Sequence, residues 1–106
     1  MALAARAIDY MRSRIASDIT LRDVAQHCGL SRAYFAMAFR ISTGVTPHQW
    51  LLEHRVEVAH AMMRDATLRI REIAIACGFA DQSHLTRVFT RIVGASPGQW
   101  RRWRLS

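Results

Sequence analysis

The most constraining feature of this 106-residue chain is an internal repeat, because residues 21–50 occur a second time as residues 70–100. A shift of 49 positions, which becomes 50 after the inserted Ala80, aligns the two segments with nine identities. The identical pairs are Arg22/Arg71, Ala25/Ala74, Cys28/Cys77, Gly29/Gly78, Phe39/Phe89, Gly44/Gly94, Pro47/Pro97, Gln49/Gln99 and Trp50/Trp100. A solenoid needs three or more stacked units to bury a core, whereas two copies indicate a module used twice on one extended partner.

Apolar residues recur at helical spacing along the chain, and no stretch alternates at a period of two for long enough to form a strand. We expect helices over 3–15, 21–28, 31–43, 46 to about 65, 70–77, 81–93 and 97 to about 104. In each copy a short helix ends at a glycine, Gly29 or Gly78, and a capping residue, Ser31 or Asp81, opens the next helix. Such a helix–turn–helix unit places its second helix in a DNA major groove.

The predicted fold class is therefore all-α, with about seven helices arranged as two helix-turn-helix lobes joined by a long linker helix. Lobe one covers about residues 1–45, the linker helix about 46–65 and lobe two about 66–106. A linker of about twenty residues spans roughly 30 Å at ~1.5 Å per residue, close to the ~34 Å between successive major-groove faces. We expect one chain to place its two recognition helices, 31–43 and 81–93, in adjacent major grooves of a duplex.

The charge of the chain agrees with such a partner. Fifteen arginines and no lysine stand against eight acidic residues, which gives a formal net charge of +7 and favours nucleic acid or another anionic surface. An arginine bias from base composition explains the missing lysine but not the net charge. No apolar run approaches the roughly 18 residues of a membrane span, and the start MALAARA lacks an export signal, so we expect a cytoplasmic protein.

Two stretches of the second copy resemble a family signature. Gly78–Phe89 (GFADQSHLTRVF) and Gly94–Arg101 (GASPGQWR) are similar to the signature of the AraC/XylS transcription regulators. The resemblance covers essentially the whole chain and includes a linker-helix pattern at Arg55-Val56, Ala59 and Met62-Met63. It implies a seven-helix, bilobal domain that binds double-stranded promoter DNA. Separately, we expect no cofactor, and RNA polymerase is a candidate further partner. Relatives usually carry this domain behind an effector-binding domain, and we expect that domain to be absent from this chain.

Residues with short polar side chains around one arginine form the outward face of the second recognition helix. Ser83, Thr86, Arg87 and Thr90 follow helical spacing opposite an inward line of Leu85, Val88, Phe89 and Ile92, and Gln82 lies at the helix start. Arginine can donate two hydrogen bonds to guanine, and glutamine can pair with adenine. We expect base contacts from Gln82, Ser83, Thr86 and Arg87; the alternative is an ordinary solvent face.

The first recognition helix differs, because its equivalent face is Ala33, Ala36, Met37 and Arg40. Relatives commonly carry bulky polar or basic residues at the positions of Ala36 and Met37. Alanine and methionine cannot hydrogen-bond to base edges, but they can pack on thymine methyl groups. Ala33, Ala36 and Met37 are therefore the expected base-contacting residues of a weakly reading lobe; the alternative is that this apolar strip packs on another protein.

Phosphate contacts are expected from basic and helix-opening residues. The candidates are Ser31, Arg32, Arg40, Thr46, Arg55, His84, Arg91 and Ser96, of which Thr46 and Ser96 would add backbone donors at helix starts. Arg55 has an equal alternative, an ion pair with Glu53, Glu57 or an acid of a neighbouring helix. Arg101, Arg102 and Arg104 around Trp103 are expected to form an electrostatic fringe or to be solvated.

Catalytic and metal sites are not expected. His48, His54 and His60 are six residues apart, so each is rotated by roughly 240° from the last and they cannot share a metal on one helix. Cys28 and Cys77 lie on apolar faces and are expected to be buried small side chains, and Trp50 and Trp100 to be paired core residues. The alternative function is a helical protein-interaction module that docks a partner such as RNA polymerase.

Overall fold

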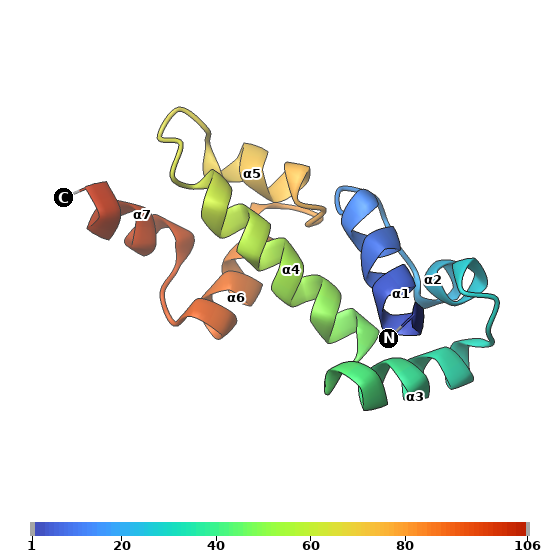
Figure 1. The fold of residues 1–106 in the computed structure, drawn as a ribbon. Helices are drawn as coiled ribbons and strands as arrows, with labels where there is room; N and C mark the ends of the chain where they lie inside the picture. Colours follow the sequence, from blue (N-terminus) through green and yellow to red (C-terminus); the bar gives the residue numbers. More distant parts are fainter. Residues whose placement is uncertain (1, 106) are drawn as a thin grey trace. The chain divides into compact units, whose positions relative to one another are not determined.

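The computed structural model describes residues 2–105, and this part of the chain forms seven α-helices and no strand (Figure 1). The helices are α1 (Ala2–Ser13), α2 (Leu21–His27), α3 (Arg32–Thr43), α4 (Pro47–Met62), α5 (Ile70–Ala76), α6 (Gln82–Val93) and α7 (Pro97–Leu105). The expected all-α fold, with two helix-turn-helix pairs in α2/α3 and α5/α6, is confirmed.

The linker helix α4 is shorter than the sequence pattern predicts. It has 16 residues and ends at Met62, not near Asp65. The amides of Arg64 and Asp65 donate to the carbonyls of Ala61 and Met62, three residues earlier in each case. The α-helical hydrogen-bond pattern is therefore replaced by turns at this point. Sixteen residues correspond to a helix about 24 Å long.

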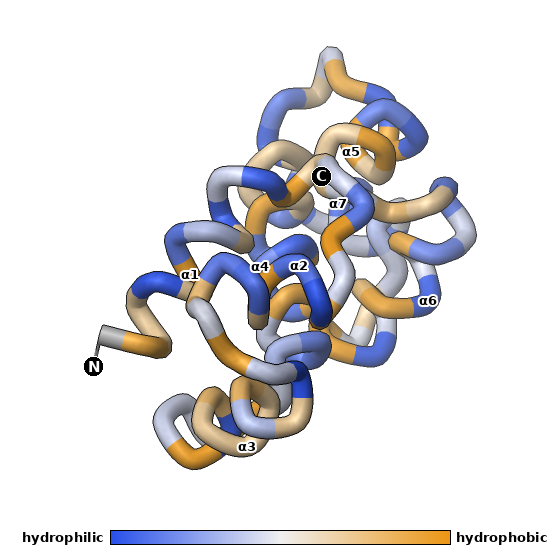
Figure 2. Tube along the Cα trace, turned by 90° about the vertical axis from the view of Figure 1, so that its right-hand side faces the viewer, coloured by the Kyte–Doolittle hydropathy of each residue, from blue (hydrophilic) through white to orange (hydrophobic). Residues whose placement is uncertain are grey.

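The chain divides into two compact units, unit 1 (Met1–Leu51) and unit 2 (Leu52–Ser106), and the division falls inside α4. In unit 1, α1 packs on both α2 and α3, and α2 packs on α3. Apolar and hydrophilic stretches alternate along these helices, which is how each helix presents one face to a core (Figure 2). The buried core of unit 1 consists of Ala7, Met11, Val24, Ala25, Phe35, Phe39 and Leu51.

Unit 2 repeats this plan with the rest of α4 in the place that α1 takes in unit 1. Helix α6 packs on α5 and on α7, and α4 contributes three of the buried side chains, with Met63 just beyond its end. The buried core consists of Leu52, Val56, Ala59, Met63, Ile73, Ala74, Cys77, Phe79, Leu85, Val88 and Phe89. The spacing of Ala7 and Met11 in α1 recurs at Ala59 and Met63, so the internal similarity extends beyond the segment that aligns by identity.

The turns of the two helix-turn-helix units have the same backbone conformation. Gly29 and Gly78 adopt left-handed φ values of 71° and 90°. The next amide, that of Leu30 or Phe79, bonds to the carbonyl five residues back at 3.0 Å in both copies. This is the Schellman arrangement, in which glycine at the left-handed position lets the chain reverse at the end of a helix. The repeated glycine therefore fixes the same turn between the two helices of each pair.

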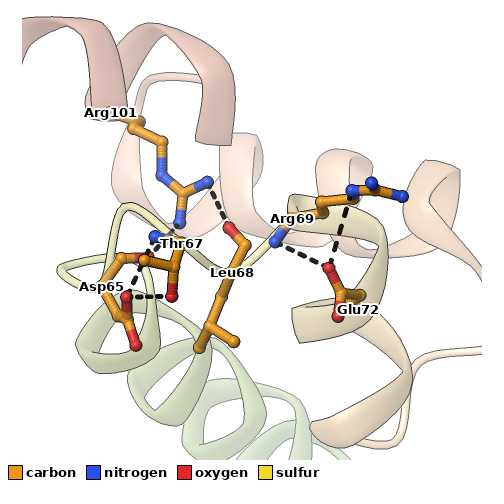
Figure 3. Close-up of polar contacts among 6 residues, drawn as sticks. All are labelled: Asp65, Thr67, Leu68, Arg69, Glu72 and Arg101. Atoms are coloured by element: carbon orange, nitrogen blue, oxygen red, sulfur yellow. Dashed lines mark hydrogen bonds and ion pairs between the residues drawn. The ribbon is translucent and has the colours of Figure 1, made fainter.

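Side-chain caps set the starts of the short helices. Thr20 Oγ1 accepts from the Asp23 amide and the Asp23 carboxylate accepts from the Thr20 amide, each at 3.1 Å, so α2 begins with a capping box. The equivalent residue in unit 2, Arg69, supplies no side-chain cap, as its residue type predicts. The Glu72 carboxylate accepts from the Arg69 amide at 3.1 Å and lies 3.9 Å from its guanidinium (Figure 3).

Three burial predictions are wrong in detail. Ile92 was expected on the inward line of α6 but is 42% exposed. It lies in the last turn before the cap at Gly94, and the next residue, Val93, packs on the core in its place. Cys28 is half-buried while Cys77 is fully buried, and both thiols are free. Trp50 and Trp100 pack against the two cores but are only half-buried.

Arg101 is the largest departure from expectation. Instead of joining an electrostatic fringe, it is half-buried and donates four hydrogen bonds to backbone carbonyls. Two go to the carbonyl of Met63, at 3.3 and 3.2 Å. One goes to Asp65 at 3.2 Å and one to Leu68 at 2.7 Å, and Figure 3 shows Arg101 beside these two residues. The guanidinium thus ties α7 to the segment that joins α4 to α5.

Candidate nucleic-acid interface

Helix α6 presents a polar, cationic face next to its turn. Leu85, Val88 and Phe89 are buried, which directs Gln82, Ser83 and Arg87 to the surface, and Thr86 is half-buried. Asp81 caps the helix by accepting from the His84 amide at 2.8 Å. The Thr90 hydroxyl donates to the Thr86 carbonyl at 2.6 Å and is therefore turned along the helix. Arg87 is the exposed side chain of this face that can donate two parallel hydrogen bonds to one base.

Helix α3 presents an apolar face at the equivalent positions. Phe35 and Phe39 are buried, Ala33 is exposed, Met37 is 54% exposed and Ala36 is half-buried. In Figure 2, α3 is coloured orange or pale orange over much of its length. Ser31 caps the helix by accepting from the Tyr34 amide at 3.2 Å. The expected outward positions of the first recognition helix are thus accessible, although Ala36 only in part.

Two exposed residues of α3 were missed by the sequence reasoning. Tyr34 is 55% exposed and Ile41 is 78% exposed, and with Met37 they follow the spacing i, i+3, i+7 along one stripe. The sequence feature that could have identified them is their helical spacing, which places them on a different side of α3 from the buried Phe35 and Phe39. The alignment of the repeat sets Tyr34, Met37 and Ile41 against His84, Arg87 and Arg91. The same stripe is therefore aromatic and aliphatic in unit 1 and basic in unit 2.

The candidate phosphate contacts fall into an accessible group and a less accessible one. Exposed residues are Ser31, Arg32, Arg40, Thr46 and Arg91, while His84 and Ser96 are half-buried. The His84 ring lies edge-on to Phe79, with the ring centroids 5.1 Å apart. Thr46 and Ser96 cap α4 and α7 by accepting from the amides of Gln49 and Gln99, at 3.1 and 3.2 Å. Their hydroxyl oxygens thus cap the helices. The N-terminus of each helix carries the positive end of the helix dipole, which would attract a phosphate.

Arg55 lies in a different environment from the other candidates. It is 8% exposed, and among the described residues it is the charged side chain that is buried. Burial raises the pKa of the Cys77 thiol to about 11, and the positive charge of Arg55 opposes part of this rise. Burial of this degree favours the structural alternative for Arg55 over a phosphate contact, because a phosphate approaches from solvent.

Within residues 2–105, no three histidine, cysteine or acidic side chains are grouped so as to hold a metal ion. In the same part of the chain, no helix has the length and apolarity required to cross a membrane. The raised pKa of Cys77, caused by burial, disfavours the thiolate form that a nucleophile needs.

Comparison with known proteins settles the family. A family model described as a helix-turn-helix domain matches residues 5–102. The chain is a helix-turn-helix domain of the AraC type. The HTH-type transcriptional activator RhaR of Salmonella dublin is 33% identical over 94 residues, which are 89% of this chain and 33% of that protein. This chain therefore spans about a third of the length of the curated relative.

Solved structures show the same fold. The DNA-binding domain of AdpA, a global transcriptional factor crystallised in complex with a target DNA, is 28% identical with a TM-score of 0.88. That alignment covers 93% of this chain and 89% of the AdpA domain. A transcriptional regulator of Chromobacterium violaceum with an AraC-type DNA-binding domain has a TM-score of 0.88 at 24% identity, covering 97% of this chain and 92% of that one. The AraC-type resemblance inferred from residues 78–101 is thus confirmed.

Proposed function

We propose that this AraC-type chain is the sequence-specific DNA-binding domain of a transcription regulator, and that α3 and α6 are its two recognition helices. The observation that supports this most directly is the pair of identical glycine turns, each followed by a capped helix whose outer face is open. The net charge of +7 supplies the electrostatic attraction to phosphates that such binding needs.

The two helices would read DNA by different chemistry. Arg87 would donate to guanine in the major groove, with Gln82, Ser83 and Thr86 contacting neighbouring base edges. Ala33, Ala36 and Met37 would pack against thymine methyl groups without hydrogen bonds. Ser31, Arg32, Arg40 and Arg91, with the helix starts at Thr46 and Ser96, would bind phosphates.

We also propose that a single chain occupies two adjacent major grooves, because it already contains two reading units. Helix α4 alone, about 24 Å long, is shorter than the ~34 Å between successive groove faces. The turns at either end of α4 would therefore have to contribute to the separation. We further propose that effector binding lies outside this chain, that the regulator contacts RNA polymerase, and that it acts in the cytoplasm, where bacterial DNA lies.

The test begins with selection of bound sites from a random pool of DNA duplexes. The selected site is then titrated with the chain at several salt concentrations, and its protection is mapped by footprinting. We expect affinity to fall steeply with salt, because phosphate neutralisation releases counterions. Two protected major grooves per bound chain are expected. A protein-docking module would instead show little duplex affinity at any salt, and protection of one groove per chain would contradict the two-groove proposal.

A further inference from the structure

The centre of the outward face of α3 is apolar. Met37 lies two residues from each of the buried Phe35 and Phe39. Two residues of an α-helix correspond to a rotation of about 200°, so the Met37 side chain leaves the helix on the side opposite the core. Ala33 and Ala36, about one turn earlier, extend the same face toward the start of the helix, and Ala33 is exposed.

The equivalent position of α6 is polar. Arg87 lies two residues from each of the buried Leu85 and Phe89, so it is placed on its helix as Met37 is on α3. Its guanidinium can donate two hydrogen bonds to one base, whereas the thioether of methionine has no donor. Three aligned pairs differ in this way between the units: Ala33/Ser83, Ala36/Thr86 and Met37/Arg87.

Polar groups of α3 lie at its two ends. Ser31 Oγ accepts from the amide of Tyr34 at 3.2 Å, and the Thr43 hydroxyl donates to the carbonyl of Phe39 at 2.8 Å. Arg32 opens the helix and Arg40 lies in its last turn, and the proposed function assigns both to phosphates. Base recognition by the middle of α3 therefore depends on apolar contact.

A pyrimidine offers one apolar group in the major groove, the methyl group at C5 of thymine. 5-Methylcytosine carries the same group at the same ring position, whereas cytosine and uracil carry hydrogen there. An apolar side chain placed on an unmethylated base edge leaves polar groups without water or a partner, which costs free energy. From the chemistry of α3, we propose that unit 1 recognises the C5 methyl group itself, so that both thymine and 5-methylcytosine are its ligands.

This recognition rests on the proposed DNA binding and gives it a regulatory consequence. Methylation of a cytosine that faces α3 would strengthen binding without a change of base sequence. Tyr34 and Ile41, both exposed, continue the apolar surface beside Met37 and would exclude water from the contact. Unit 2 would not respond, because the O6 and N7 acceptors that Arg87 would bind belong to guanine and are unchanged by the methyl group.

The first measurement replaces single thymines of the selected duplex by deoxyuridine. This change removes one methyl group and leaves every hydrogen-bonding group of the base in place. We expect a roughly fourfold loss of affinity for each thymine that α3 contacts, the amount that corresponds to burial of one such carbon. Thymines of the other half-site, identified as the half in which Arg87→Ala relaxes base preference, are the control and should show no loss. Absence of any loss under α3 would overturn the proposal.

The second measurement separates thymine from methylated cytosine as the source of the methyl group. Duplexes with cytosine or 5-methylcytosine at the responsive position are compared. The methylated duplex should bind roughly fourfold more tightly. Equal affinity for the two duplexes would overturn the proposal.

Reciprocal variants assign the effect to one side chain. Met37→Arg places in unit 1 the residue of unit 2, and Met37→Gln is an uncharged replacement of similar length. Because Met37 is exposed, both should fold, which thermal unfolding checks. In both, the ratio of affinities for methylated and unmethylated duplex should fall from roughly four to about one. Arg87→Met should create a methyl dependence in the other half-site.

An unchanged ratio in the folded Met37 variants would overturn the proposal. Binding to the selected site that ignores the methyl group contradicts methyl recognition alone. Lack of duplex affinity at any salt contradicts the proposed DNA binding and methyl recognition together, so the two failures are distinguishable.

Discussion

The Nη1 atom of Arg101 lies 2.7 Å from the carbonyl oxygen of Leu68, which is 33 residues earlier in the chain. Its other nitrogens reach the carbonyls of Met63 and Asp65. These carbonyls follow the end of α4, where an α-helix leaves acceptors without partners from within the helix. One arginine side chain therefore satisfies the end of one helix and holds the segment that leads into the next.

Replacement of Arg101 by alanine should destabilise the chain more than replacement of an exposed arginine does. We expect the free energy of unfolding to fall by about 2–3 kcal/mol, as for hydrogen bonds that involve a charged group. Urea denaturation measures the change, and Arg102→Ala, a neighbouring exposed arginine, is the matched control. Equal stability of the two variants would show that the carbonyl contacts contribute little.

Arg87 and Met37 occupy equivalent positions of the repeat, so they form a matched pair for DNA binding. Arg87→Ala should cost about 1–3 kcal/mol at the selected site and relax preference at one base pair. Met37→Ala should cost less, and its effect should appear mainly at a thymine. The measurement is binding of each variant to the selected site and to its single-base changes. Strong preference under α3 with none under α6 would reverse the assignment.

The repeated tryptophans should be structural residues of intermediate importance. Trp100 lies against His60, with ring centroids 4.4 Å apart, and Trp50 packs on the core of unit 1. Because both are half-buried, truncation to alanine should cost about 2–3 kcal/mol, below the 3–5 kcal/mol typical of large buried aromatics. Thermal unfolding should be measured beside DNA affinity, with the exposed Trp103→Ala as control. An unchanged melting temperature with lost binding would mean that the rings contact DNA.

The capping box of α2 should make stability depend on pH. Hydrogen bonds from Thr20, first from its backbone amide, hold the pKa of the Asp23 carboxyl below its usual value of 3.8. Because the folded-state pKa is lowered, the stabilisation is present above the unfolded pKa and is lost as the pH falls through the folded one.

We therefore expect Asp23→Ala to lower the melting temperature at pH 6, and the difference from the parent chain to shrink below about pH 4. Thermal unfolding across this range is the measurement. Asp18→Ala, at an exposed position of the preceding loop, is the control. A difference that stays constant down to pH 2.5 would show that the carboxylate charge is not involved.

Local signals in the sequence were sufficient for most of the fold. Glycine turns, caps such as Thr20 and Asp81, and proline at the starts of α4 and α7 are read directly from residue types, and all recur in the structure. Errors arose where packing decides the outcome. Ile92 follows the inward period of α6, yet its turn lies at the end of the helix, where Val93 faces the core.

For the candidate site, helical periodicity found the open faces of α3 and α6 but not the roles of individual arginines. Arg55 and Arg101 have the same residue type as Arg87, and only tertiary packing separates them. Arg101 is directed to carbonyls more than thirty residues away, a contact that no local pattern encodes. Tyr34 and Ile41 are exposed although their residue types favour burial, so residue type did not place them on the open face of α3.

The unequal cores of the two units have a consequence for how the chain opens. Within the described residues, the buried core of unit 2 has eleven members and that of unit 1 has seven. Buried apolar contacts determine which part of a native protein exchanges its amide hydrogens last. Amides of α5 and α6 should therefore stay protected after those of α2 and α3 have exchanged. The two copies of one motif would then unfold as separate cooperative elements. The apolar recognition helix α3 would be exposed to solvent before the basic recognition helix α6.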